Sequence, residues 1–154
     1  MDLSFLREFK IDQIGIVVPD IDASIIEFNQ LLGISNFETM VYPDENKIKD
    51  TFYYGKPANF SIKVGFTKLV NLELELIQPL AGESIYKDFL LEKKEGLHHF
   101  RISVSHEQFE NICSHMKMLG IEKISQGPGV RSKSKWAVFG TRKYLGTDFE
   151  IKSV

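Results

Sequence analysis

Cysteine is almost absent from this chain of 154 residues: Cys113 is the only one, so no disulfide can form within the chain. Its apolar neighbours Phe109, Ile112 and Met116 follow a helical spacing, which favours a small thiol packed in the core over a nucleophile. No apolar run reaches the ~18 residues that a membrane-spanning helix needs, and the first residues lack the long apolar stretch of a signal peptide. We therefore expect a cytoplasmic protein that does not enter a membrane.

Excess positive charge is also absent, since the net charge is −2. Nucleic-acid binding usually needs a strongly basic face, so we expect no nucleic-acid partner. The length and the hydrophobic share of 43% are ordinary for one globular domain. One basic group is either a solvated pair of strands or a landing site for a phosphorylated or acidic substrate tail: Arg131, Lys133, Lys135, Arg142 and Lys143.

The sequence does contain one unit twice. The first copy runs from a strand-like stretch at 13–18 through a helix-like stretch to the Leu-Gly pair at 32–33. The second copy runs in the same way from 99–104 to the Leu-Gly pair at 119–120. An internal repeat of this kind sets the architecture. Within a single domain over 1–154 it predicts module one at about 10–80, a connector at 81–95 and module two at about 96–154.

Hydrophobic spacing and capping residues predict the secondary structure. Residues 21–32 have helical spacing between an Asp20 N-cap and Gly33. Ser105 and Gln108 form a capping box at the start of a second long helix. We expect a short helix within 82–95, a loop over 126–130, and strands at 13–18, 37–41, 51–54, 61–66, 69–77, 99–104, 121–124, 135–140 and 147–152. The fold class is therefore α+β, with the two units side by side in a curved sheet, helices outside and a cleft inside.

Alternation along three of these strands gives each strand a polar face and an apolar face. We expect the apolar faces to pack on the helices and the polar faces to meet in the cleft. The polar faces hold Glu73, Glu75, His99, Arg101, Ser103, Asp148, Glu150 and Lys152. Burying so many ionisable groups is unfavourable unless they are paired, and either a divalent metal or water in an open cleft would pair them.

Four residues expected in the cleft occupy matching positions in the two units: Gln13 matches His99, and Glu75 matches Glu150. One imidazole, one amide and two carboxylates would admit one divalent metal ion, which could be Zn, Ni, Co, Mn or Fe. Such an ion polarises a carbonyl and stabilises an enolate, while a nearby carboxylate moves the proton. Each residue alone has a simpler interpretation, as a structural histidine, a solvated glutamate or a poorly ligating glutamine.

Four motifs carry a resemblance to a known family: QIGIVVPD at 13–20, LELIQPL at 74–80, GLHHF at 96–100 and GTDFEI at 146–151. They resemble the vicinal oxygen chelate superfamily, which includes glyoxalase I, methylmalonyl-CoA epimerase, bleomycin-resistance proteins and extradiol dioxygenases. The resemblance implies tandem βαβββ modules around a metal-binding cleft, and often a homodimer. It implies metal ligands at Gln13, Glu75, His99 and Glu150, with Glu150 also transferring a proton. His98 is then a non-ligand neighbour that faces a helix or supports His99.

The sequence departs from that family in three places. Position 13, here Gln13, is usually histidine in the epimerase and glyoxalase branches. The epimerase also has a second glutamate in its first module, for which the nearest candidate is Glu45, in a turn where a solvated acid is the simpler interpretation. Tyr53 and Tyr54 belong to a longer, more aromatic stretch than the epimerase pattern, and they either line the pocket or pack in the sheet.

These observations support one leading hypothesis and one alternative. The leading hypothesis is a metal-dependent lyase or isomerase, similar to methylmalonyl-CoA epimerase or lactoylglutathione lyase. Its substrate would be a small molecule such as a CoA or glutathione thioester or a hemithioacetal. The alternative, which Gln13 favours, is a metal-free small-molecule or drug-binding protein of the bleomycin-resistance type. An extradiol dioxygenase fits less well. Members of that branch hold iron with two histidines and one glutamate, and Gln13 takes the place of one of those histidines.

Overall fold

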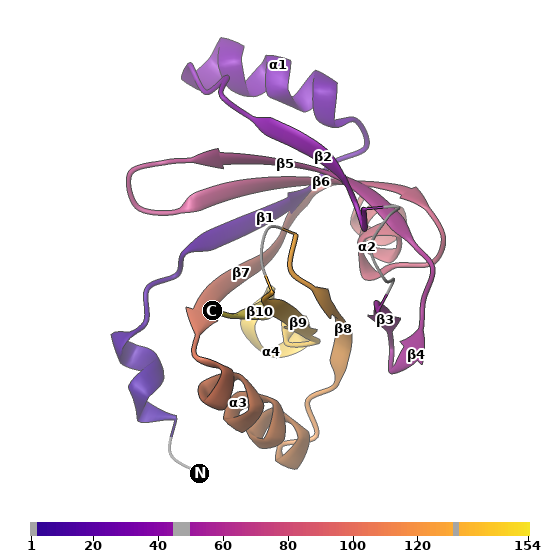
Figure 1. Ribbon diagram of the computed structural model, residues 1–154. Helices are drawn as coiled ribbons and strands as arrows, with labels where there is room; N and C mark the ends of the chain where they lie inside the picture. Colours follow the sequence, from indigo (N-terminus) through magenta and orange to yellow (C-terminus); the bar gives the residue numbers. More distant parts are fainter. Residues whose placement is uncertain (1–2, 45–49, 131–132) are drawn as a thin grey trace.

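The computed structural model describes residues 3–44, 50–130 and 133–154. Over these ranges ten strands form one mixed sheet that curls into a half-barrel (Figure 1). The strands are β1 (Gln13–Val17), β2 (Glu38–Tyr42), β3 (Phe52–Tyr53), β4 (Lys56–Pro57), β5 (Ser61–Lys68), β6 (Glu73–Ala81), β7 (Gly96–Val104), β8 (Lys123–Pro128), β9 (Lys135–Phe139) and β10 (Asp148–Ser153). The helices are the 3-10 helix η1 (Ser4–Glu8), α1 (Ile21–Leu32), α2 (Ile85–Lys93), α3 (His106–Met118) and α4 (Arg142–Leu145). The strand order is β2-β5-β6-β1-β7-β10-β9-β8-β3-β4.

The internal repeat is visible in the pairing of the central strands. β1 and β7, the first strands of the two modules, lie antiparallel to each other at the middle of the sheet. Each of them pairs in parallel with the last strand of its own module, β1 with β6 and β7 with β10. The register is also equivalent, because Glu75 lies opposite Gly15 and Glu150 lies opposite Arg101. The predicted α+β fold with two tandem modules in one curved sheet is confirmed.

Two helices cover the outer face of the sheet, as predicted. The Asp20 carboxylate caps α1 by accepting hydrogen bonds from the backbone N–H groups of Asp22 and Ala23, and Gly33, with φ 69°, ends the helix. In α3 the predicted capping box of Ser105 and Gln108 is present. α1 packs on the sheet at a cluster around Ile16, Val18, Ile21 and Leu76, and α3 packs at one around Phe109, Ile112, Phe149 and Ile151. Cys113 lies half-buried beside the second cluster.

The inner face of the half-barrel has a large apolar cluster of its own. β5 and β9 contribute Val64, Phe66, Trp136 and Val138 to this cluster. α2 adds its buried side chains to the same cluster: Ile85, Tyr86 and Phe89. The concave side is therefore mainly apolar, and the polar faces of β6, β7 and β10 are embedded in it.

Long-range pairing explains why some strand boundaries differ from the predictions. The loop predicted over 126–130 was wrong for residues 126–128, which belong to β8 because they pair with β9 and, at Gln126, with Phe52 of β3. The strand predicted from residue 69 begins only at Glu73, since the chain turns at 69–72, where the Leu69 N–H donates to the Leu72 carbonyl. That strand also continues past Pro79. η1 and α4 had not been predicted.

None of the helices in the described ranges is long and apolar enough to cross a membrane.

Candidate active site

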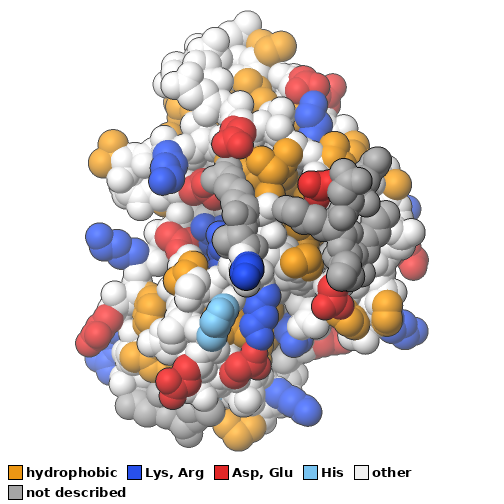
Figure 2. All heavy atoms as spheres, in the orientation of Figure 1, with side chains coloured by type: hydrophobic (Ala, Val, Ile, Leu, Met, Phe, Trp, Pro, Cys, Tyr) orange, Lys and Arg blue, Asp and Glu red, His pale blue; other side chains and the backbone are white. Residues whose placement is uncertain are grey.

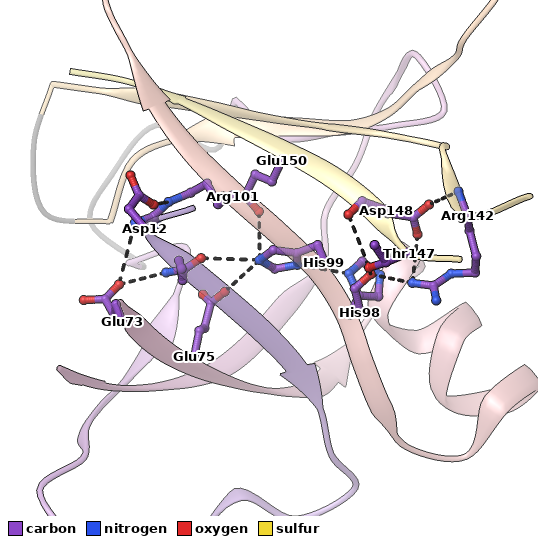
Figure 3. A network of polar contacts seen from close by, with 11 residues as sticks. Asp12, Glu73, Glu75, His98, His99, Arg101, Arg142, Thr147, Asp148 and Glu150 are labelled. Atoms are coloured by element: carbon purple, nitrogen blue, oxygen red, sulfur yellow. Dashed lines mark hydrogen bonds and ion pairs between the residues drawn. The ribbon is translucent and has the colours of Figure 1, made fainter. Parts of the chain in front are cut away.

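A buried histidine ring lies at the centre of a polar cluster where the two modules meet (Figure 3). His99, on β7, is 0% exposed, and its Nε2 atom lies 3.3 Å from Oε1 of Gln13 on β1. The same Nε2 atom lies 3.3 Å from Oε2 of Glu75 on β6 and 3.2 Å from Oε2 of Glu150 on β10. We call these four residues the His99 cluster. The structure thus brings together all four residues singled out in the sequence.

The absence of a side chain at residue 15 makes room for the histidine ring. Gly15 follows Gln13 by two residues on β1 and lies directly opposite His99 in the antiparallel pair. A Cβ atom at this position would lie 2.2 Å from Cε1 of His99, far inside van der Waals contact. The glycine of the first motif is therefore needed because the ring passes over the backbone there.

A second layer of polar residues orients Gln13. The Gln13 side-chain N–H donates to Oε1 of Glu73 over 2.8 Å, which turns the amide oxygen toward His99. Glu73 also lies 3.9 Å from the Arg101 guanidinium, which is held by an ion pair of 2.8 Å with Asp12. The neutral side chain at position 13 therefore has a fixed orientation and presents an oxygen to the cluster.

The charges in the cluster favour added positive charge. Burial alone would lower the pKa of His99, but the neighbouring carboxylates of Glu150 and Glu75 outweigh it and raise that pKa. Burial raises the pKa of Glu150, and Glu75 raises it further, although His99 acts in the opposite direction. The His99 imidazole and the Glu150 carboxylate therefore both have raised pKa values, and each holds a proton more tightly than it would in water. A cation placed here would be stabilised by the same charges.

The cluster reaches a cavity of about 570 Å³, open mouth included, on the concave side of the sheet. Glu75 and Glu150 line it beside two basic residues, Arg101 and Lys152. The rest of its wall is mainly apolar or aromatic: Tyr42, Ile62, Val64, Phe66, Tyr86, Val130 and Trp136. Basic and hydrophobic side chains lie next to each other in the middle of this face of the molecule (Figure 2).

Lys152 is the residue of this cavity whose charge is least compensated. Its ammonium group forms no hydrogen bond or ion pair with any residue in the described ranges, whereas Arg101 is paired with Asp12. Burial lowers the pKa of Lys152, and the positive charge of Arg101 lowers it further. An unpaired ammonium group in a partly apolar cavity is suited to binding a negatively charged group of a ligand.

The four residues of the His99 cluster are of types that bind divalent metals, but their donor atoms do not surround a common point. Among the residues that the structure describes, no group of three or more His, Cys, Asp or Glu side chains is placed to hold a metal ion. Metal–nitrogen and metal–oxygen bonds are about 2.0–2.2 Å long, so two ligands at a right angle lie roughly 3 Å apart. The contacts of His99 Nε2 with Glu75 and Glu150, at 3.3 and 3.2 Å, are close to that spacing.

His98 lies behind His99 and faces helix α2, one of the two placements expected. It is 1% exposed, and its ring contacts those of Tyr86 and Phe89 with centroid distances of 5.0 and 5.2 Å. Burial lowers the pKa of His98 well below its usual value, and the positive charges of His99 and Arg142 act in the same direction. His98 is therefore a neutral imidazole.

The two tyrosines considered for the pocket lie elsewhere. The Tyr53 hydroxyl donates to Oδ2 of Asp88 over 2.7 Å, and Tyr54 lines a second hollow with Asp88, Phe89 and His98. Of the two alternatives, packing in the sheet holds for Tyr53, which packs against the inner apolar cluster from β3, beside β8, and neither tyrosine lines the cavity of the His99 cluster. Glu45 lies outside the described residues.

Two other predicted placements need correction. Asp148 does not reach the cavity: at the start of β10 it pairs with Arg142 over 3.2 Å and lines the second hollow. The basic residues do not form one landing site, because Arg142 and Lys143 line that hollow, while Lys135 pairs with Glu110 on α3. Arg131 lies outside the described residues. The aromatic walls at Tyr42, Tyr86 and Trp136 were missed, since their approach depends on tertiary packing.

A sequence model of the Glyoxalase/Bleomycin resistance protein/Dioxygenase superfamily matches residues 12–139. Solved structures share the fold at low sequence identity. A hypothetical protein from Bacillus halodurans C-125 is 24% identical, with 95% of this chain and 94% of that chain covered and a TM-score of 0.66. Methylmalonyl-CoA epimerase from Mycobacterium tuberculosis is 19% identical, with 94% and 87% covered and a TM-score of 0.63.

A Streptomyces coelicolor methylmalonyl-CoA epimerase variant, in complex with 2-nitronate-propionyl-CoA, is 17% identical. That match covers 94% of this chain and 93% of the epimerase, with a TM-score of 0.63. A search of curated proteins finds no match. Identities this low establish a common fold and leave the reaction to be argued from the site.

The position of Gly15 under the His99 ring gives a test of the site's geometry. Because the ring is fully buried, Gly15→Ala should lower the free energy of unfolding by about 1–3 kcal/mol, the usual effect of over-packing. Gly65→Ala on β5 is the matched control, since the nearest atom to its Cβ is the end of the Ile21 side chain at 3.3 Å. Urea unfolding followed by Trp136 fluorescence measures both. Equal stability of the two variants would contradict this placement of His99.

Proposed function

Because the chain belongs to the glyoxalase/bleomycin resistance protein/dioxygenase superfamily, we propose that it is a metal-dependent lyase or isomerase that moves a proton next to a substrate carbonyl. The observation that carries the proposal is the convergence of three oxygens on Nε2 of His99. The donors come from equivalent positions of both modules, and two of them, Glu75 and Glu150, line the cavity on the concave side of the sheet.

Gln13, Glu75, His99 and Glu150 would hold one divalent metal ion, for which Zn, Ni, Co, Mn and Fe are the candidates. When bound, such an ion polarises a carbonyl oxygen and stabilises the charge of an enolate. Two carboxylates would offset the charge of the ion. The amide of Gln13 would contribute a neutral oxygen, already oriented by its hydrogen bond to Glu73.

Glu150 is the residue that we expect to move the proton. Its side chain is 8% exposed and borders the cavity, so it can reach a substrate while remaining largely out of water. Burial raises its pKa, which makes its carboxylate a stronger base than that of a surface glutamate. Glu75 faces it from the other module, with a side chain that is 12% exposed.

The cavity supports a substrate that carries a negatively charged group beside its carbonyl. The unpaired ammonium of Lys152 would bind that group, and the apolar wall around Phe66 and Trp136 would contact the rest of the molecule. CoA thioesters are the first class to test, because a similar structure is named as an epimerase bound to a propionyl-CoA derivative. Glutathione hemithioacetals are the second class.

A metal-free binding protein is the second candidate, and a specific observation favours it. The polar groups of the cluster already satisfy one another: His99 contacts three oxygens, and Gln13 donates to Glu73. A cluster paired in this way is stable without an ion. In that case the apolar cavity itself would bind an aromatic or apolar ligand, and the function would not respond to metal chelators.

Removing the carboxylate of residue 150 should abolish proton transfer. We expect Glu150→Gln to lower turnover by roughly 10²- to 10⁴-fold, the usual contribution of a general base. Deuterium incorporation next to the carbonyl, in ²H₂O with methylmalonyl-CoA and with a glutathione hemithioacetal, measures the step whichever overall reaction follows. Glu27→Gln on the exposed face of α1 is the control. Full activity of a correctly folded Glu150→Gln protein would contradict the assignment.

Replacing Lys152 tests the charge of the substrate. Lys152→Met keeps the length of the side chain and removes its charge, so we expect KM for a carboxylate-bearing substrate to rise about tenfold or more, the value of one charged hydrogen bond. KM for an analogue without the carboxylate should not change. Lys10→Met, at an exposed position, controls for the loss of a surface charge. Equal effects on both substrates would show that Lys152 does not recognise the charge.

A further inference from the structure

Helix α2 places one tyrosine ring on the concave side of the sheet. Tyr86 lies in the first turn of α2, just after the Ser84 hydroxyl that caps this helix by accepting the N–H of Lys87. Tyr86 is 4% exposed, and its ring meets those of Phe60 and His98 with centroid distances of 6.4 and 5.0 Å. The position of the tyrosine ring is therefore fixed by its neighbours.

Tyr86 also lines the cavity of the His99 cluster, together with Glu75 and Glu150. Phe60 and His98 do not line this cavity, so they cover one part of Tyr86 while another part of it reaches the cavity. Burial raises the pKa of the Tyr86 hydroxyl well above its usual value, and the charges of Glu150 and Glu75 raise it further. The hydroxyl thus keeps its proton at neutral pH and is a hydrogen-bond donor.

The Tyr86 hydroxyl has no hydrogen-bond partner in the part of the chain that the structure describes. The Tyr42 hydroxyl, on the wall of the same cavity, differs because it donates to the Pro128 carbonyl over 2.8 Å. Within the described ranges, Nδ1 of His115 is the one sealed polar side-chain atom without a partner. The unpartnered Tyr86 hydroxyl is therefore not sealed, and since its ring is enclosed on the other sides, it opens into the cavity.

A polar group in such a place points to an acceptor supplied by a ligand, because buried polar groups without a partner are rare and unfavourable. The neighbouring charges indicate which acceptor. Glu75 and Glu150 repel a further anionic group, so a neutral oxygen fits beside Tyr86 better than a carboxylate does. A negatively charged group of the same ligand has Lys152 elsewhere on the cavity wall.

We propose that Tyr86 is a substrate-binding residue whose hydroxyl donates a hydrogen bond to the carbonyl oxygen of the substrate. The identity of that oxygen rests on the proposed function, in which Glu150 removes a proton from the carbon next to the carbonyl. When the Glu150 carboxylate takes this proton, the electron pair of the C–H bond stays on the substrate, and the carbonyl oxygen gains the negative charge of an enolate. A donor already fixed toward that oxygen binds the enolate more strongly than the neutral carbonyl.

Thermal stability tests whether the hydroxyl lacks a partner in the free protein. Tyr86→Phe keeps the ring and removes only the oxygen, so we expect it to melt at the wild-type temperature or above. Tyr42→Phe is the matched comparison, because it loses the hydrogen bond to Pro128 and should melt roughly 2–4 °C lower. Scanning calorimetry measures both variants. A fall in Tyr86→Phe as large as that in Tyr42→Phe would overturn the proposal.

Turnover tests the hydrogen bond in the reaction. With methylmalonyl-CoA in ²H₂O, we expect Tyr86→Phe to lower kcat for deuterium exchange roughly 10²-fold, the effect of removing one donor to a developing oxyanion. KM should rise by no more than roughly tenfold, the effect of one neutral hydrogen bond. Tyr144→Phe, at a position on α4 that is 59% exposed, controls for the loss of a tyrosine hydroxyl.

Binding tests the contact with the carbonyl oxygen itself. Isothermal titration compares methylmalonyl-CoA with 2-carboxypropyl-CoA, in which a methylene group replaces the thioester carbonyl. We expect Tyr86→Phe to raise Kd for methylmalonyl-CoA roughly 3- to 10-fold and to leave Kd for the other probe unchanged. An equal change for both probes, or no change for either, would overturn the contact.

These measurements separate the failure of this inference from the failure of the proposed function. A wild-type chain that binds methylmalonyl-CoA but exchanges no deuterium contradicts the proposed function, and the two Kd values then decide whether Tyr86 contacts the carbonyl. Exchange that continues at the wild-type rate in Tyr86→Phe overturns the role of Tyr86 and leaves the proposed function standing.

Discussion

Nε2 of His99 meets oxygens from three other strands at the line where the two modules join, and this contact constrains much of the surrounding structure. It requires β1 and β7 to lie in one register, so that Gly15 rather than a larger residue lies opposite the ring. It requires the two parallel pairs, β1 with β6 and β7 with β10, to be equivalent, so that Glu75 and Glu150 approach from both sides. Duplication of one unit satisfies both requirements, because the same register is then built twice.

The composition of the concave face gives this contact its chemical character. β5, β9 and α2 surround the cluster with apolar side chains, so its charges are poorly solvated and act strongly on one another. The neighbouring carboxylates raise the pKa of His99, and burial raises the pKa of Glu150. Around the same cavity, Arg101 is neutralised by Asp12, whereas Lys152 has no hydrogen-bond or ion-pair partner among the described residues. The site therefore combines an electronegative cluster suited to a cation with one separate positive charge suited to an anionic ligand.

The sequence predicts much of this site because the relevant rules are local. The repeat pairs Gln13 with His99 and Glu75 with Glu150, and strand alternation points Arg101, Glu150 and Lys152 inward. The same rules fail where distant segments decide the outcome. Tyr53 and Tyr54 follow a hairpin that crosses to β8, and Asp148 is drawn to Arg142. A bulge in β7 leaves His98 without a partner on β1, and no local pattern predicts it, because it appears only when the two strands are aligned.

The proposed function requires the His99 cluster to hold a divalent metal ion. The most direct measurement is the metal content of the purified, untagged chain by plasma mass spectrometry, before and after incubation with Zn, Ni, Co and Mn, with His99→Ala beside it. We expect one divalent ion per chain in the wild type and none in the variant. No bound metal in the wild type under any of these conditions would contradict it, and would favour a metal-free binding protein.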